Sequence, residues 1–228
     1  NTGTTPVPSH HGLLSTILWQ LGEAGETVYA LEGSVFVAGA AVQWIRDGLK
    51  AIKASKDVEQ LAAGGDRDSG VVVVPAFVGL GAPHWDPDAR GAIVGLTFGT
   101  GIEDIALATV DAMAYQVTDV LKSMSLDAAG EIEALRVDGG AAVNDALLQF
   151  QADILRVPVE RPKVTETTAL GAAFLAGLAT GFWSSTDEVA AAWQLDRRFE
   201  PRMEQAERDR LVQRWRHAVE RSKGWAAG

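Results

Sequence analysis

The feature that most constrains the fold is an alternation of strand-like and helix-like segments in the second half of the chain. Residues 132–137 and 157–161 are short strand-like segments. Residues 144–155 and 167–178, which follow them, carry apolar side chains at helical spacing. Such an alternation is typical of α/β proteins, so the sequence predicts an α/β fold.

The first half of the chain predicts a hairpin followed by helices and further strands. Residues 13–18 and 27–31 are two short strand-like runs with glycines between them. A helix is expected over residues 34–48, with Ser34 as its N-cap and Gly48 near its end. The other expected elements are a helix at 58–63, strands at 71–77 and 92–97, and helices at 102–123, 186–193 and 204–225.

Composition excludes several classes of protein. The chain has 228 residues, of which 47% are hydrophobic, and this suffices for a sizeable core. Its net charge of −10 repels nucleic acid and anionic lipid, and no apolar run is long enough to span a membrane. The chain has no cysteine, so disulfides and thiolate metal sites are excluded. A cytoplasmic location is expected, with neither nucleic acid nor a membrane as partner.

The sharpest local motif is the run Leu-Arg-Val-Asp-Gly-Gly-Ala-Ala-Val-Asn at residues 135–144. A strand ends in an acidic residue, and Gly139 and Gly140 then precede a helix start. Glycines let the backbone approach a ligand closely, and the new helix directs free N–H groups to the same place. Asn144 lies on the first turn, where its amide could contact a base or ribose. The alternative is a purely structural junction with Asn144 near the cap.

A second candidate is the pair Gly39 and Gln43 in the predicted helix at 34–48. Glycine inside a helix costs about 1 kcal/mol relative to alanine, so a packing or ligand role is needed to offset it. Gln43 is one turn later and shares the face of Gly39. That face could accept a flat ring. The alternative is close helix–helix packing through Gly39, with Gln43 merely exposed.

The loop at residues 79–90 is the third candidate. It contains His84, Trp85 and Asp86, and a histidine near aspartates suggests acid–base chemistry. Its glycines and prolines favour a structural role instead, with Trp85 anchored in the core and Asp86 fixing a turn.

Together these stretches resemble glycerol kinases of the FGGY family of carbohydrate kinases. The resemblance covers nearly the whole chain, and its most specific segment is the Gly-Ala-Pro-His-Trp-Asp-Pro loop at residues 81–87. The matching segments are residues 29–34, 39–47, 74–87, 91–97, 114–116, 136–140, 149–155 and 164–173.

The resemblance implies two actin-like domains, each with a mixed sheet of the ribonuclease H type and flanking helices. Residues 1–228 would be the C-terminal, nucleotide-binding domain, and the N-terminal catalytic domain would be absent. ATP or ADP with Mg²⁺ would bind between the domains. The reaction implied is transfer of the γ-phosphoryl group to glycerol, giving sn-glycerol 3-phosphate, with an aspartate of the N-terminal domain as base.

The resemblance also implies site residues. Gly39 and Gln43 match positions that contact the nucleotide, and Gly140 and Asn144 match positions that border the adenosine. No catalytic residue and no metal ligand is carried over to this chain. Expected partners are glycerol, the N-terminal domain and further copies of the protein. Three positions depart from the family pattern, namely His84, Phe98 and Thr118.

Two other functions remain open from the sequence. One is a kinase of the same family that acts on another polyol or sugar, because substrate choice belongs to the other domain. The other is a non-catalytic actin-like module that only binds a nucleotide. As half of a glycerol kinase, the 228 residues alone are expected to lack kinase activity and to bind ATP weakly.

Overall fold

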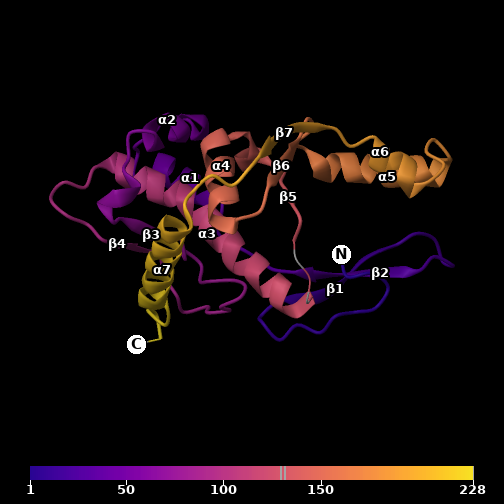
Figure 1. Cartoon of the computed structure of the whole chain (residues 1–228), viewed down its shortest axis with the longest axis horizontal. Helices are drawn as coiled ribbons and strands as arrows, with labels where there is room; N and C mark the ends of the chain where they lie inside the picture. Colours follow the sequence, from indigo (N-terminus) through magenta and orange to yellow (C-terminus); the bar gives the residue numbers. More distant parts are fainter. Residues whose placement is uncertain (129, 131, 228) are drawn as a thin grey trace. The chain divides into compact units, whose positions relative to one another are not determined.

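The structure, a computed structural model, describes residues 1–128, 130 and 132–227 of the chain. The chain divides into two compact units (Figure 1). The first unit combines Asn1–Ile132 with Glu204–Gly228, and the second is Glu133–Met203. The first unit is therefore discontinuous in sequence, and the second is inserted within it.

The predicted hairpin is confirmed in the first unit. Strand β1 (Leu14–Gln20) pairs antiparallel with β2 (Thr27–Glu32), and Leu14 lies opposite Glu32. The connection contains Gly22 at φ 76°, a backbone conformation that glycine adopts at little cost.

Helix α1 spans Ala40–Asp47, so the predicted start at Ser34 is wrong. Gly39 occupies the N-cap position instead. The carbonyl of Ser34 accepts a hydrogen bond of 2.8 Å from the N–H of Ala82, and Val37 is buried at 5% exposure. The backbone before Gly39 is thus bonded to a distant loop, and this tertiary contact replaces the first helical turns that the apolar spacing predicts.

The core of the first unit forms around α3 (Ile102–Ala128). Strands β3 (Val72–Val74) and β4 (Ala92–Val94) pair antiparallel beside it. Both strands are shorter than expected. Pro75 follows β3 and has no N–H to donate, and Gly95 leaves the strand conformation at φ 85° after β4.

Helix α7 (Gln205–Ser222) completes this core from the far end of the sequence. It packs on β3 and β4, as Figure 1 shows in yellow. Trp215 is 1% exposed and stacks on Tyr115, with ring centroids 5.2 Å apart and 9° between the planes. The apolar face of α7 is therefore buried within its own unit.

The second unit contains a three-stranded sheet of order β5-β6-β7. Strand β5 runs parallel to β6, and β7 runs antiparallel to β6. The sequence did not predict β7. The bounds in this unit are β5 Leu135–Arg136, α4 Asp145–Leu155, β6 Val159–Pro162, α5 Thr167–Thr180, α6 Thr186–Ala191 and β7 Leu195–Phe199.

Short 3-10 turns and one small helix connect the longer elements. The helix predicted at residues 58–63 is present in the first unit. The bounds of these pieces are η1 Ser55–Asp57, α2 Val58–Ala62, η2 Arg67–Ser69 and η3 Gly140–Val143.

The loop at residues 79–90 is held by hydrogen bonds. Trp85 is 40% exposed, so its predicted place in the core is wrong; its indole N–H instead donates to the carbonyl of Gly12 at 2.6 Å. Asp86 fixes a turn as expected, because its carboxylate accepts from the N–H groups of Asp88 (2.9 Å) and Ala89 (3.0 Å). These contacts favour the structural interpretation of the loop.

Candidate functional site

The Gly-Gly turn of the second unit is open on its outer side. Gly139 has φ 77°, and its N–H donates to the carbonyl of Thr165 at 2.9 Å. A Cβ added at Gly139 or Gly140 would meet no heavy atom within 4 Å among the described residues. Packing inside this structure therefore does not explain why Gly140 lacks a side chain, and a flat ligand has room to approach the backbone there.

Asn144 is the N-cap of α4. Its Oδ1 accepts the N–H of Leu147 at 2.8 Å, and the residue is 9% exposed. This is the structural role that the sequence left open as an alternative. An N-cap asparagine uses only its oxygen in the cap, so a second role for its NH₂ group is compatible with this geometry.

The turn lies at the carboxyl end of β5. The carboxyl end of the parallel neighbour β6 leads into residues 163–166, which precede α5. The hydrogen bond between the N–H of Gly139 and the carbonyl of Thr165 joins the loop after β5 to the loop after β6. Ligands of open α/β sheets gather at this edge. Thr165 is therefore a candidate residue of the ligand site at this turn, and the sequence did not predict it. The feature that could have indicated it is its position directly after β6, the strand parallel to β5.

A network of charged side chains fixes the helical turn that follows Gly140. The guanidinium of Arg161, on β6, donates to the carbonyl of Ala142 at 3.1 Å and to Asp145 at 2.7 Å. It also contacts Asp196 of β7 at 2.8 Å. These bonds anchor the turn to the sheet, so the open glycines sit on a rigid support.

Gly39 and Gln43 lie at the start of α1 in the first unit. Both are exposed, and a Cβ at Gly39 would meet nothing within 4 Å in the described parts of the chain. Close helix packing through Gly39, the alternative from the sequence, is therefore not observed. Gln43 lies four positions after Gly39, which is the spacing of residues on one helical face.

The structure thus brings each predicted pair together within its own unit. Gly39 lies near Gln43 on α1, and Gly140 lies near Asn144 at the entry to α4. No cluster of three or more histidine, cysteine, aspartate or glutamate side chains suited to a metal ion occurs among residues 1–128, 130 and 132–227. Nor does that part of the chain contain a helix long and apolar enough to cross a membrane.

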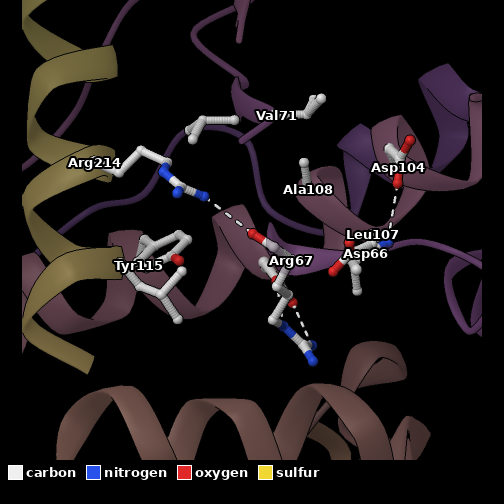
Figure 2. A pocket seen from close by; sticks show the side chains of 11 residues that line it. Asp66, Arg67, Val71, Asp104, Leu107, Ala108, Tyr115 and Arg214 are labelled. Carbon is white, nitrogen blue, oxygen red and sulfur yellow. Dashed lines mark hydrogen bonds and ion pairs between the residues drawn. The ribbon is translucent and has the colours of Figure 1, made fainter. Parts of the chain in front are cut away.

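An ion pair between a partly exposed arginine and a buried aspartate is the main electrostatic feature of the first unit (Figure 2). The guanidinium of Arg67 donates to both carboxylate oxygens of Asp111, at 2.7 and 2.9 Å. Burial raises the pKa of Asp111 to about 6, and the hydrogen bonds and charge of Arg67 offset this only in part. Figure 2 also shows Arg214 donating to the carbonyl of Arg67, at 3.0 Å.

The cavity beside this ion pair is too small for an organic ligand. Its volume is about 20 Å³, which leaves room for about one water molecule. The pair of Arg67 and Asp111 therefore ties α3 to the residues before β3, and its role is structural.

The second unit is thus an α/β unit with an open Gly-Gly turn at the carboxyl edge of parallel strands, the edge at which open α/β sheets receive ligands. The sequence profile of the FGGY family of carbohydrate kinases, C-terminal domain, matches residues 2–180. The chain belongs to this family.

Related proteins agree with this assignment. The chain is 57% identical over 225 residues to a glycerol kinase of Deinococcus radiodurans, covering 99% of this chain and 44% of that protein. A glycerol kinase 2 of Thermotoga maritima is also 57% identical over 225 residues, which is 99% of this chain and 45% of the relative. The chain thus spans less than half the length of these relatives.

Solved structures show the same fold. The glycerol kinase of Plasmodium falciparum with ADP matches with a TM-score of 0.87 and 37% identity, covering 97% of this chain and 44% of that chain. A ligand-bound xylulose kinase of Lactobacillus acidophilus matches with a TM-score of 0.81 and 26% identity, over 97% of this chain and 45% of that chain. The predicted α/β fold of the actin-like class is confirmed.

Proposed function

We propose that residues 1–228 form the C-terminal, ATP-binding domain of a glycerol kinase. The complete enzyme would transfer the γ-phosphoryl group of ATP to glycerol, giving sn-glycerol 3-phosphate, in the cytoplasm. The observation that carries the proposal is the open Gly139-Gly140 turn at the carboxyl edge of β5 and β6. Similarity to glycerol kinases over 99% of the chain supports this choice of substrate.

The nucleotide would be held by four residues. Gly39 and Gln43 would contact the nucleotide, and Gly140 and Asn144 would border the adenosine. The exposed backbone at Gly39 and Gly140 supports this assignment, because a ring can approach a backbone without side chains. Mg²⁺ would accompany the triphosphate and neutralise its charge during transfer.

No residue of this chain is assigned as the catalytic base. Phosphoryl transfer depends on positioning and charge stabilisation, so a nucleotide-binding domain contributes by orienting ATP. The base and the glycerol site would belong to an N-terminal domain, in the part of the relatives' length that this chain does not span. Homo-oligomers are proposed as well, with the exposed charged face of α7 as one candidate contact surface.

The decisive test uses the full-length kinase with Gly140 changed to valine. The added side chain fits the open space in the protein but occupies the path of the adenosine. We expect the KM for ATP to rise at least about ten-fold, the cost of losing about 1.4 kcal/mol of binding, and the KM for glycerol to stay the same. Gly171→Val is the matched control, because a Cβ at Gly171 also meets nothing within 4 Å in the described chain.

An unchanged KM for ATP in Gly140→Val would contradict the nucleotide site at this turn. A substrate panel of glycerol, xylulose and gluconate with the unmodified enzyme tests the substrate. Preference for a sugar over glycerol would select the other kinases of the family. No phosphorylation of any of the three would favour a module that only binds the nucleotide.

A further inference from the structure

A second cavity of the first unit lies between one face of α3 and one face of α7. Its volume is about 320 Å³, roughly that of ten water molecules in the liquid. Asp119, Lys122 and Ser123 of α3 line it at helical spacing, and Arg216 of α7 lies on its wall. Pro83 closes one side. None of these residues belongs to the proposed nucleotide site.

Two cations on this wall have no partner. Lys122 and Arg216 are exposed, and neither forms a hydrogen bond or ion pair with any residue that the structure describes. The nearby acid Glu220 is already paired with Lys223 at 2.5 Å. Two carboxylates, those of Asp119 and Glu220, also line this cavity, but the two cations are free to bind an anionic group that enters it.

A serine hydroxyl lines the same cavity. Ser123 is 7% exposed, and its Oγ has no hydrogen-bond partner in the described chain. Other buried hydroxyls of α3 are satisfied: that of Thr118 donates to the carbonyl of Ala114 at 2.8 Å. An unpartnered hydroxyl that lines a cavity, on a residue otherwise buried, is suited to a ligand or water within that cavity.

The cavity lining also includes a histidine–aspartate pair. His84 lies 3.9 Å from Asp119, whose carboxylate also accepts the indole N–H of Trp215 at 2.7 Å. The Asp119 oxygens can accept hydrogen bonds from ligand hydroxyls. Leu126 and Val219 supply an apolar part of the lining. Cationic, hydroxylic and apolar groups thus converge on one space, which is the usual composition of a small-molecule site.

We propose that this cavity binds the phosphate group of a small phosphate or phosphate monoester. Lys122 and Arg216 would contact the phosphate oxygens, because both side chains bind phosphate through charge-assisted hydrogen bonds. Ser123 would donate its hydroxyl proton to a third oxygen. The volume exceeds what a phosphate group needs, so a monoester with a few hydroxyl groups fits better than the free ion.

Calorimetric titration of the full-length protein with ribose 5-phosphate and, separately, inorganic phosphate tests this site. Lys122→Ala and Arg216→Ala are each expected to weaken binding about ten-fold, and Ser123→Ala a few-fold, with unchanged melting temperatures. Lys53→Ala is the matched control: it removes an exposed lysine that does not line the cavity, and its affinity should stay within about two-fold of the unmodified protein.

Tighter binding of the monoester identifies an ester as the ligand, and equal affinities identify free phosphate; both outcomes support a phosphate site. Three results would overturn it. They are no binding of either probe, unchanged binding in the Lys122→Ala/Arg216→Ala double variant, and a loss in Lys53→Ala as large as in Lys122→Ala. Because the double variant leaves Gly140 and Asn144 intact, its outcome is independent of the nucleotide site.

Discussion

Replacing Asp111 by asparagine removes a carboxylate that is only 4% exposed while keeping a side chain of nearly the same shape. Its partner Arg67 bonds both carboxylate oxygens, and a simple count of ion pairs predicts that the change destabilises the fold. The raised pKa of Asp111 predicts the opposite. Burial of the charge costs more than Arg67 returns, so ionising this side chain is less favourable in the folded chain than in the unfolded chain.

The size of the expected stability change follows from the pKa shift of Asp111. The pKa of Asp111 is about 6 in the folded chain and 3.8 as a model value, a difference of about 2 units or about 3 kcal/mol. A raised acid pKa means that the folded state holds its proton more tightly than the unfolded state. Stability from this group is therefore fully present below about pH 4 and is lost as the pH rises through about 6.

Asparagine does not carry this cost. It loses about 1 kcal/mol of hydrogen bonding between Arg67 and a charged carboxylate. The free energy of unfolding of Asp111→Asn should therefore exceed that of the unmodified chain by about 2 kcal/mol at pH 7. Near pH 4 the gain should vanish, because Asp111 is then protonated. Arg67→Met is the opposite perturbation: it leaves the buried carboxylate without its cation and should cost about 3 kcal/mol at pH 7.

Urea denaturation at pH 4.5, 6 and 8 measures these differences for the unmodified chain and both variants. The m-values must agree among the proteins, so that the midpoints report stability alone. The reasoning is refuted if Asp111→Asn is less stable than the unmodified chain at pH 8. A difference between the two that does not change between pH 4.5 and 8 would equally contradict it.

Three further predictions concern other parts of the chain. Asn144→Ser keeps the α4 cap and should preserve stability while weakening ATP binding, whereas Asn144→Ala should also cost about 1 kcal/mol in thermal unfolding. Although burial opposes ionisation of Asp127, hydrogen bonds from Ser9, His10 and His11 lower its pKa. The stability lost in Asp127→Asn should therefore be largest at neutral pH and shrink as the pH falls below about 4, and equal melting-temperature losses at pH 3 and 7 would contradict this. Gly95→Ala forces a side chain onto the carbonyl of Gly70 at φ 85° and should lower stability by at least about 2 kcal/mol in urea denaturation.

The sequence predicted most elements because their patterns are local. The helix at 102–123 and the strand–glycine–helix junction at 135–144 depend on spacing and turn residues that lie next to each other. The start of α1 could not be found in this way. Apolar residues after Ser34 have helical spacing, but their backbone bonds to Ala82, a contact that no local pattern contains.

Strand β7 was missed for a similar reason. Its central residues Asp196, Arg197 and Arg198 are charged, which is typical of an exposed loop. They form a strand because β6 lies beside them and because Arg197 and Arg198 pair with acids brought near by the fold, Asp145 and Glu160. An edge strand held by ion pairs has no apolar alternation to reveal it.

The candidate site was predictable only in part. The glycines at 139 and 140 are visible in the sequence, and the roles of Gly39 and Gln43 came from the family resemblance. That Asn144 caps α4 was one of two open alternatives, and the structure alone supplied its bond to Leu147. The place of Thr165 beside the turn depends on parallel pairing of β5 and β6, which sequence spacing does not specify.

The discontinuous first unit has a consequence for synthesis on the ribosome. Tyr115 and β3 emerge early, but Trp215 and the rest of α7 follow only after the whole of Glu133–Met203. At ordinary elongation rates, about 5–20 residues per second, that insertion delays the covering helix by about 4 to 14 seconds. During this interval the apolar faces of β3 and α3 lack their cover, so nascent chains halted before Glu204 should be ready clients for chaperones.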